Sequence, residues 1–324
     1  MRFALEKLFR LALLLVSVAT VSYGLLCMSP VDPTRMYIGD DALRVSPEQR
    51  QRIEERWGLD RSPAARYALW LGRLARGDLG RSQIYERPVA DVIAEKCRLS
   101  AGLMAIAWSL SGLIGFSLGV LAGAVQGSWL DRAIRWFAYL VASAPAFWVG
   151  MVLLMVFSLS LRVTPPCCAA PPGTDPRLVS WGEWLRHLLL PALTLSLTGV
   201  AGVLLHTRQK LLDVLRSDYA QLARAQGASL PAILWHHGLR NIGLPAINVQ
   251  LASFSELFGG AVLAEQVFAY PGLGQATVQA GLRSAVPVLL GIVLFSAVFV
   301  FCGNLLADLL CRAVDPRVRL AGTP

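Results

Sequence analysis

Residues 219–245 read YAQLARAQGASLPAILWHHGLRNIGLP, the most informative stretch of this chain. Helix-forming residues run up to Gly227, where a glycine can take a positive φ and turn the chain into a second short helix. Long apolar segments lie on both sides of the stretch. We therefore predict a compact helical knob on a membrane surface. Two short helices packed on each other move as one body, so such a knob suits the transmission of force from a partner protein.

Composition places the whole chain in a bilayer. Of its 324 residues, 55% are hydrophobic and 16% are charged, and the mean hydropathy is +0.53. The hydrophobic share is higher and the charged share lower than in a soluble domain of this size. A transmembrane helix needs about 20 mostly apolar residues. This criterion predicts an all-α membrane protein with six transmembrane helices, at residues 8–28, 99–125, 134–161, 187–207, 242–268 and 286–311.

The fourth of these spans has the weakest signal. Pro191 and several Ser and Thr residues lower its hydrophobicity. Polar side chains are tolerated in a span that faces other helices, so the span is retained.

Basic residues predict the orientation. With the N-terminus inside, the cytoplasmic segments carry 13 Lys and Arg residues and the short outer loops carry 4. This asymmetry predicts that both termini are cytoplasmic. It also accounts for much of the net charge of +9, so no nucleic-acid partner is expected. A cleaved signal peptide is the alternative for the first span, but no small-x-small site follows it, and a retained helix is favoured.

The segment 30–98 is predicted to lie outside the membrane as amphipathic helices. Ser46 can cap one helix, with Pro47 at its first position. A second helical stretch covers residues 64–80, AARYALWLGRLARGDLG, with Gly77 and Gly80 as breakers. The segment either packs on the outer surface or forms a lip that receives a delivered ligand.

Adjacent cysteines, Cys167 and Cys168, stand in the proline-rich outer loop TPPCCAAPPG. They could be a pair of soft metal ligands, a disulfide or inert thiols. No His or Cys stands nearby at ligand spacing, and the four histidines are scattered, so we predict no metal site.

Several blocks, in order along nearly the whole chain, carry a family resemblance. They are SPEQRQRIEERWGLD, RYALWLGRLARGDLGRS, RPVADVI, SAPAFWVGMVLLMVFSLSLRVTPP, LRHLLLPALTLSL, VFAYPGLGQATVQA and NLLADLLCRAVDPRVRL. The chain resembles the inner-membrane permease subunit of a bacterial ABC importer of the dipeptide, oligopeptide and nickel class, and is similar to the first of its two permeases.

The resemblance implies a coupling segment at residues 219–241, which would seat in a cleft of an ATPase subunit. Ala223 and Gly227 match the alanine and glycine of the family's EAA-type motif, and Gln221 replaces its glutamate. The alternative is an ordinary amphipathic interfacial helix. The expected coupling residues are Tyr219, Gln221, Ala223, Arg224, Gly227, His237, Leu239, Arg240 and Asn241.

The resemblance further implies the partners. They are a second homologous permease, one or two P-loop ATPases that bind ATP and Mg²⁺, an extracytoplasmic solute-binding protein and the lipid bilayer. This chain has no GxxxxGK[ST] loop, so neither a cofactor nor catalytic residues are expected in it. Peptides are the favoured cargo, with nickel or a metal chelate as the alternative. An ion-coupled secondary transporter and a membrane-embedded enzyme remain as other classes, but no clear inverted repeat and no convergent catalytic set supports them.

A translocation pathway or gate is expected from the third to fifth spans and the loop that follows. Glu256 would contact a cationic ligand group or pair with a neighbouring span, because a carboxylate within a span is costly unless it faces protein or water. Gly259 and Gly260 would permit close helix approach. The expected pathway residues are Pro145, Phe147, Trp148, Asn248, Glu256, Glu265, Pro271 and Gly272.

The predicted organisation has four parts. They are a first transmembrane helix at 1–29, an extracytoplasmic helical segment at 30–98, a five-helix transmembrane domain at 99–311 that contains the coupling segment, and a cytoplasmic tail at 312–324.

Overall fold

The computed structural model describes residues 2–28, 46, 48, 52, 62–82, 84–171, 174, 179–283 and 285–314. Most of the helix predicted after Ser46 and most of the predicted C-terminal tail lie outside these residues. The chain forms two compact units, which are described separately. Met1–Ser100 with Pro271–Phe301 form the first, and Ala101–Tyr270 with Cys302–Pro324 form the second.

The first unit contains a helix that the sequence predicted. Helix α4 (Pro63–Ala75) begins where the Ser62 Oγ accepts a hydrogen bond from the Ala65 N–H at 3.4 Å. The chain leaves the helix before Gly77, which has φ +78°. A Ser cap, a proline at the first position and a glycine after the end are the local signals of helix boundaries. The prediction of a helix broken at Gly77 is confirmed.

Aromatic side chains join α4 to α1 (Arg2–Met28) within this unit. The rings of Tyr23 and Trp70 are stacked with centroids 5.7 Å apart, and the hydroxyls of Thr20 and Tyr67 are 2.7 Å apart. The first predicted span therefore has a tertiary partner in the segment after it.

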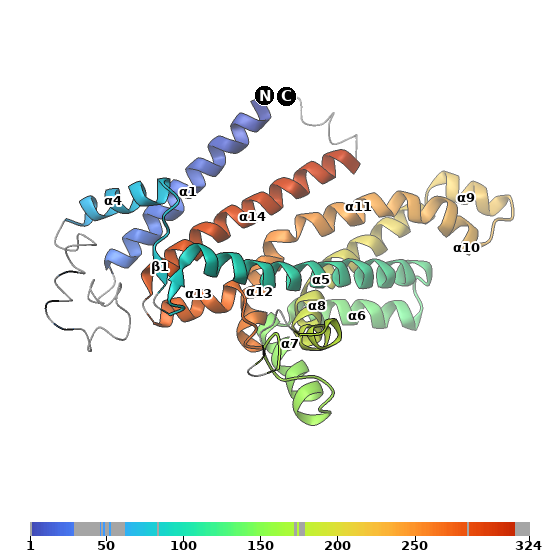
Figure 1. The fold of residues 1–324 in the computed structure, drawn as a ribbon. Helices are drawn as coiled ribbons and strands as arrows, with labels where there is room; N and C mark the ends of the chain where they lie inside the picture. The colour runs from blue at the N-terminus through green and yellow to red at the C-terminus, as the bar shows by residue number, and fades with distance from the viewer. Residues whose placement is uncertain are drawn as a thin grey trace. The chain divides into compact units, whose positions relative to one another are not determined.

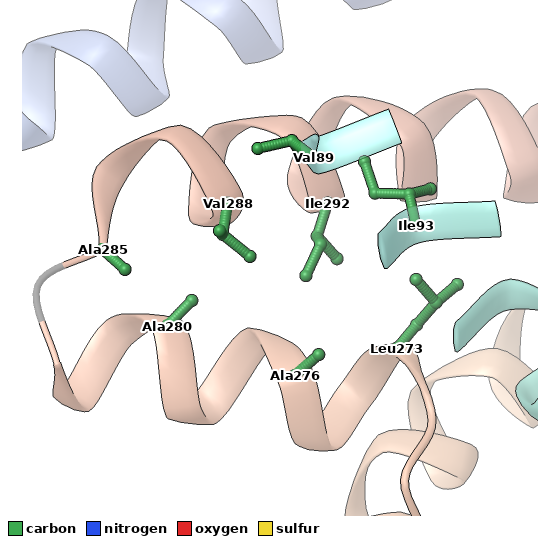
Figure 2. Packing of buried hydrophobic residues seen from close by; sticks show 8 residues of the cluster. All are labelled: Val89, Ile93, Leu273, Ala276, Ala280, Ala285, Val288 and Ile292. Atoms are coloured by element: carbon green, nitrogen blue, oxygen red, sulfur yellow. The ribbon is translucent and has the colours of Figure 1, made fainter. Parts of the chain in front are cut away.

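A second core of the first unit lies around α13 (Leu273–Leu282) and the starts of α5 (Val89–Ala124) and α14 (Val286–Val314). Figure 2 shows Ala276 and Ala280 on α13 pointing toward Val288 and Ile292 on α14. The two alanines let the helices approach closely. A short hairpin of β1 (Arg81–Ser82) and β2 (Arg87–Pro88), which the sequence did not reveal, leads into α5.

The second unit begins with the rest of α5, which packs on α8 (Trp181–Leu215) through a glycine stripe. A Cβ at Gly115 would lie 2.9 Å from the Val200 carbonyl oxygen, and one at Gly119 would lie 2.7 Å from that of Leu204. Gly123 likewise faces Leu211. Glycines four residues apart lie on one helix face and permit such close approach.

Helix α8 corresponds to the predicted fourth span and is longer than predicted. Its most apolar window is the most buried among the four single helices long and apolar enough to cross a membrane. Thr194, Ser196 and Thr207 are fully buried, so its polar side chains face protein. The prediction that the polar side chains of the fourth span face protein is confirmed.

The third and fifth predicted spans are bent pairs of helices rather than single helices. Helix α6 (Trp129–Ser143) meets α7 (Ala146–Leu153) and η2 (Leu154–Ser160) at 110°, and the bend falls at Pro145, which has no N–H to continue α6. Residues 241–252 meet α12 (Phe254–Val267) at 51° across Ser253. If each pair is one crossing, the described residues hold up to six spans, as predicted.

The remaining helices are α9 (Asp218–Ala225), α10 (Leu230–Ile233), η3 (Leu234–Gly238) and α11 (Leu239–Ala252). Figure 1 shows α9 and α10 next to each other, and in chain order they come after α8 and before α11.

Candidate functional site

Helix α9 starts almost directly after α8. The chain turns at Ser217, and the Gln221 side chain donates from Nε2 to the Arg216 carbonyl at 2.9 Å. This bond satisfies a carbonyl at the end of α8 that has no intrahelical partner. Gln221, which stands where the family motif has a glutamate, therefore has a structural contact in this chain.

Gly227 makes the turn after α9. Its φ is +86°, the left-handed region that L side chains rarely adopt. Hydrogen bonds from the Gly227 N–H to the Arg224 carbonyl at 2.9 Å and from the Ala228 N–H to the Ala223 carbonyl at 3.0 Å close the helix end. The predicted conformation of Gly227 is confirmed.

The second half of the coupling segment differs from the prediction. We expected a separate short helix, whereas α10, η3 and α11 follow one another without a break from Leu230 to Ala252. A wide π-helical turn at residues 234–238 allows the helix to continue through Gly238, which is buried against Leu211. The coupling segment thus runs directly into the fifth span.

One side of the coupling segment packs on the rest of the second unit. Ala220 is fully buried in a core that Ile233, Ile242 and Leu211 share. Ala223 and Leu239, both predicted coupling residues, pack against this core. These two side chains hold the segment in place.

The other side carries exposed polar and apolar groups. Gln221 and Arg224 are exposed, and the Tyr219 ring lies 5.7 Å from that of His237. Asn241 donates from Nδ2 to the His237 carbonyl at 2.8 Å. The sequence analysis did not select the exposed apolar residues Leu222, Leu230 and Trp235, which are 60%, 37% and 72% exposed. The sequence pattern that could have indicated them is a bulky apolar residue in a helix that is predicted to lie on the surface.

An ion pair fixes α8 before it reaches the coupling segment. Arg208 donates from Nε and Nη2 to the Asp131 carboxylate at 2.7 and 2.8 Å, and Asp131 has no exposed surface. The Gly127 N–H also donates to this carboxylate at 3.0 Å. In the sequence, Arg208 was only one of the 13 Lys and Arg residues predicted to lie on the cytoplasmic side.

The predicted pathway residues of the second unit differ in burial. Phe147 and Trp148 are 44% and 51% exposed on α7, just after Pro145. Glu256 is exposed in the first turn of α12, and Glu265 at the other end of the same helix is buried. The Asn248 Oδ1 on α11 is buried and accepts no hydrogen bond from the described residues.

Glu265 is buried beside Tyr270, which follows α12. Burial, and next the charge of Glu265, raise the pKa of the Tyr270 phenol, and Trp184 is hydrogen-bonded to its side chain. The Tyr270 N–H donates to the Glu265 carbonyl at 2.8 Å. Glu265 is therefore part of the protein interior at this turn.

Pro271 and Gly272 precede α13, and Gly272 is its N-cap in extended conformation. The Leu273 N–H donates to the Ser100 Oγ at 2.8 Å. The two residues start a new helix within the first unit.

Near Glu256, the structure adds a residue that the sequence analysis did not select. Asn304 of α14 donates from Nδ2 to the Ser255 Oγ at 2.8 Å, and the Ser255 Oγ lies 3.0 Å from the Asn304 Oδ1. These residues are far apart in sequence, so only tertiary structure pairs them. Of the two glycines predicted to allow close approach, Gly260 does so against Leu195, whereas a Cβ at Gly259 would meet no atom within 4 Å.

Within the described residues, no group of three or more His, Cys, Asp or Glu side chains is placed to hold a metal ion. The features that the site does offer are a helical knob with an exposed face, a helix that continues from it, and bent spans.

A bent-span helical unit of this kind, with surface helices between two spans, is the architecture of a membrane permease. Residues 115–320 match the family described as binding-protein-dependent transport system inner membrane component, and the chain belongs to this family. The family is a transport component rather than an enzyme. The family assignment and the fold class predicted from the sequence are confirmed.

Relatives cover almost the whole chain. The Brucella abortus (strain 2308) protein named "Putative peptide transport system permease protein" is 36% identical over 93% of this chain and 94% of its own length. The oligopeptide transport system permease protein AppB of Bacillus subtilis (strain 168) is 32% identical over 94% of this chain and 95% of its own length. A chain of the inward-facing MetNI methionine ABC transporter has a similar fold, with a TM-score of 0.56 and 16% identity, over 69% of this chain and 96% of its own.

Proposed function

We propose that this chain is the transmembrane permease subunit of an ABC importer that moves peptides across the bacterial inner membrane, driven by separate ATPase subunits. The assignment of peptides as the cargo rests on one observation. Near full-length relatives, at 36% and 32% identity, are named as peptide and oligopeptide permeases. Their likeness favours peptides over nickel or a metal chelate.

The proposed partners follow from the family. Permeases of binding-protein-dependent systems work with ATPases and a binding protein. We extend this to a second homologous permease, one or two P-loop ATPases and an extracytoplasmic solute-binding protein. ATP and Mg²⁺ would bind to the ATPases. This chain would form the path through the membrane and would not take part in ATP hydrolysis.

The coupling segment would be the ATPase contact. An exposed face with large apolar groups next to charged and polar ones is typical of the centre of a protein interface. Trp235, Leu222 and Tyr219 supply the apolar groups, and Arg224 supplies a charge. Buried Ala220 anchors the opposite face, so a partner that pulls on the exposed face moves the whole knob.

Continuity of the helix supports a route for the motion. Because α10, η3 and α11 follow without a break, displacement of Trp235 would tilt α11, and the bend at Ser253 is where α12 could respond. Closure of an ATPase dimer would thereby change the exposure of the pathway between inward- and outward-open states.

The proposed orientation places both termini and the coupling segment in the cytoplasm. The excess of Lys and Arg in these segments supports it. Within the bundle, Glu256 on α12, next to the Ser255–Asn304 pair, is the proposed contact for a cationic group of the peptide. Phe147 and Trp148 would line the same path.

The test is recovery of this chain from native membranes in mild detergent, with mass spectrometry of its partners. Recovery with a homologous permease and P-loop ATPases is the expected result. Binding assays of peptides and of nickel on the co-encoded binding protein then decide the cargo. Recovery of the chain alone, with ion-driven transport in liposomes, would overturn the proposal.

A further inference from the structure

Cys167 and Cys168, two adjacent residues, are joined by a disulfide bond in the loop after η2. Their side chains are half-buried. The other four cysteines, which also lie in the described residues, are not disulfide-bonded: Cys27, Cys97, Cys302 and Cys311. The sequence had left a metal ligand pair, a disulfide and inert thiols open, and the structure contains the disulfide.

The two cysteines fasten their loop to two other parts of the second unit. The Cys168 N–H donates to the Phe268 carbonyl at 2.9 Å, at the turn after α12. The Cys167 carbonyl lies 3.0 Å from the Nδ1 of His187, in the first part of α8. Ala169, the next residue, is buried. The loop is thus seated through the backbone of the cysteines themselves.

On each side of the hydrogen bond between Cys168 and Phe268, one residue has a left-handed backbone conformation. Cys168 has φ +73°, and Ala269, which follows Phe268, has φ +46°. Residues with a Cβ rarely adopt this conformation, and it persists only where the surroundings enforce it. A covalent link between Cys167 and Cys168 is such a constraint, because it closes a small ring around their common peptide bond.

We propose that Cys167 and Cys168 are a redox modification site, whose oxidation to the disulfide holds Cys168 in the conformation that seats the loop on Phe268. The inference rests on the proposed orientation, in which this loop faces the oxidising outer compartment. Reduction would release the backbone constraint and weaken the contact with the turn after α12. The partner is a protein disulfide oxidant of that compartment.

The chemistry is ordinary thiol–disulfide exchange. The thiolate of one cysteine attacks the disulfide of the oxidant, which forms a mixed disulfide and releases one oxidant thiolate. The thiolate of the second cysteine then attacks the mixed disulfide and displaces the other oxidant sulfur. The two thiols lose two electrons and two protons, and the oxidant disulfide becomes a dithiol.

Alkylation of the assembled complex in right-side-out membrane vesicles tests the bond and the orientation separately. A membrane-impermeant maleimide is added with and without a phosphine reductant, and the tryptic peptide of residues 163–177 is analysed by mass spectrometry. The expected result is an unlabelled peptide that lacks two hydrogens without reductant, and a doubly labelled peptide after reduction from the outside.

Two other outcomes would each overturn one part of the proposal. Double labelling from the outside without reductant keeps the orientation and overturns the disulfide. Labelling only after permeabilisation overturns the orientation, and with it the exposure of this loop to an outer oxidant.

Amide hydrogen exchange tests the role of the bond in seating the loop. Reduction should make the Cys168 amide exchange severalfold faster, and the variant Cys167→Ala should show the fast rate with or without reductant. Cys302→Ala, a change at a free cysteine, is the matched control and should leave the slow rate in place. An unchanged rate after reduction would overturn the proposed role.

Discussion

Arg208 forms a bidentate ion pair with Asp131, and the carboxylate of Asp131 has no exposed surface. Arg135 lies 3.3 Å from the same carboxylate, one turn further along α6. The pair ties α6 to α8 a short distance before α8 ends and the coupling segment begins. Removal of the Asp131 charge leaves the largely buried Arg208 guanidinium without its carboxylate partner, which costs more than the pair itself contributes.

Asp131→Asn should destabilise the permease by about 3–5 kcal/mol, the usual cost of breaking a buried pair. The measurement is the thermal denaturation of the purified complex in detergent. Arg135→Gln is the matched control, because the Arg135 side chain is 35% exposed to solvent and its removal leaves the Arg208 pair in place, so its loss should cost only about 0–1 kcal/mol. Equal effects of the two changes would refute the special role of the Arg208 pair.

Gly227→Val should lower the amount of peptide transported per ATP hydrolysed. The φ of +86° would cost a β-branched residue about 1–3 kcal/mol, so the turn between α9 and α10 would shift. No atom lies within 4 Å of the added Cβ, so the backbone conformation alone is tested. Proteoliposomes that report both ATP hydrolysis and uptake make the measurement.

The control for this change is Gly227→Asn, because asparagine tolerates the left-handed region better. It should retain more coupling than the valine variant. Normal coupling in a well-assembled Gly227→Val complex would count against the placement of the turn in force transmission.

Trp235→Ala should weaken the association of ATPase subunits by about 2 kcal/mol, which is typical of a large aromatic side chain at the centre of an interface. Its side chain is 72% exposed in this chain, so the loss of internal packing is small. Quantitative co-purification with the ATPases is the readout. Trp181→Ala, at a tryptophan that is 80% exposed at the start of α8, should leave association unchanged. If the two substitutions weakened association equally, the coupling segment would not be the contact.

Gly119→Ala should destabilise the protein by about 1–3 kcal/mol, as overpacking does. The added Cβ would lie 2.7 Å from the Leu204 carbonyl oxygen, and the backbone of α8 cannot rotate away as a side chain could. Gly259→Ala adds the same methyl group to α12 with no atom within 4 Å, and helix propensity should make it neutral or stabilising by up to about 1 kcal/mol. Thermal denaturation of both variants checks the difference. A Gly119→Ala protein as stable as Gly259→Ala would contradict the glycine contact between α5 and α8.

Local features were predictable from the sequence because they depend on short-range chemistry. Ser62 and Pro63 start a helix, and Gly77 and Gly227 have the positive φ expected at helix ends. Pro145 favours a kink in the third span, although the sequence could not indicate a bend of 110°. That angle depends on what α7 packs against.

The sequence predicted two short helices separated by Gly227, but the continuation of the second helix into α11 was not predicted. A separate short helix was expected, yet Gly238 is buried against the Leu211 side chain and the helix continues past it through a π-helical turn. Propensity alone does not decide this, because burial against α8 stabilises the helical conformation of a glycine there.

The sequence alone indicates that the chain is a helical membrane protein, which family it resembles, and that helices end near Gly77 and Gly227. These properties follow from hydrophobicity, residue order and local backbone preference. The sequence did not indicate that Arg208 pairs with Asp131, that Asn304 contacts Ser255, or that the loop of Cys168 packs on Phe268. Each of these contacts joins residues far apart in the chain, so it depends on how the helices pack, which no local pattern encodes.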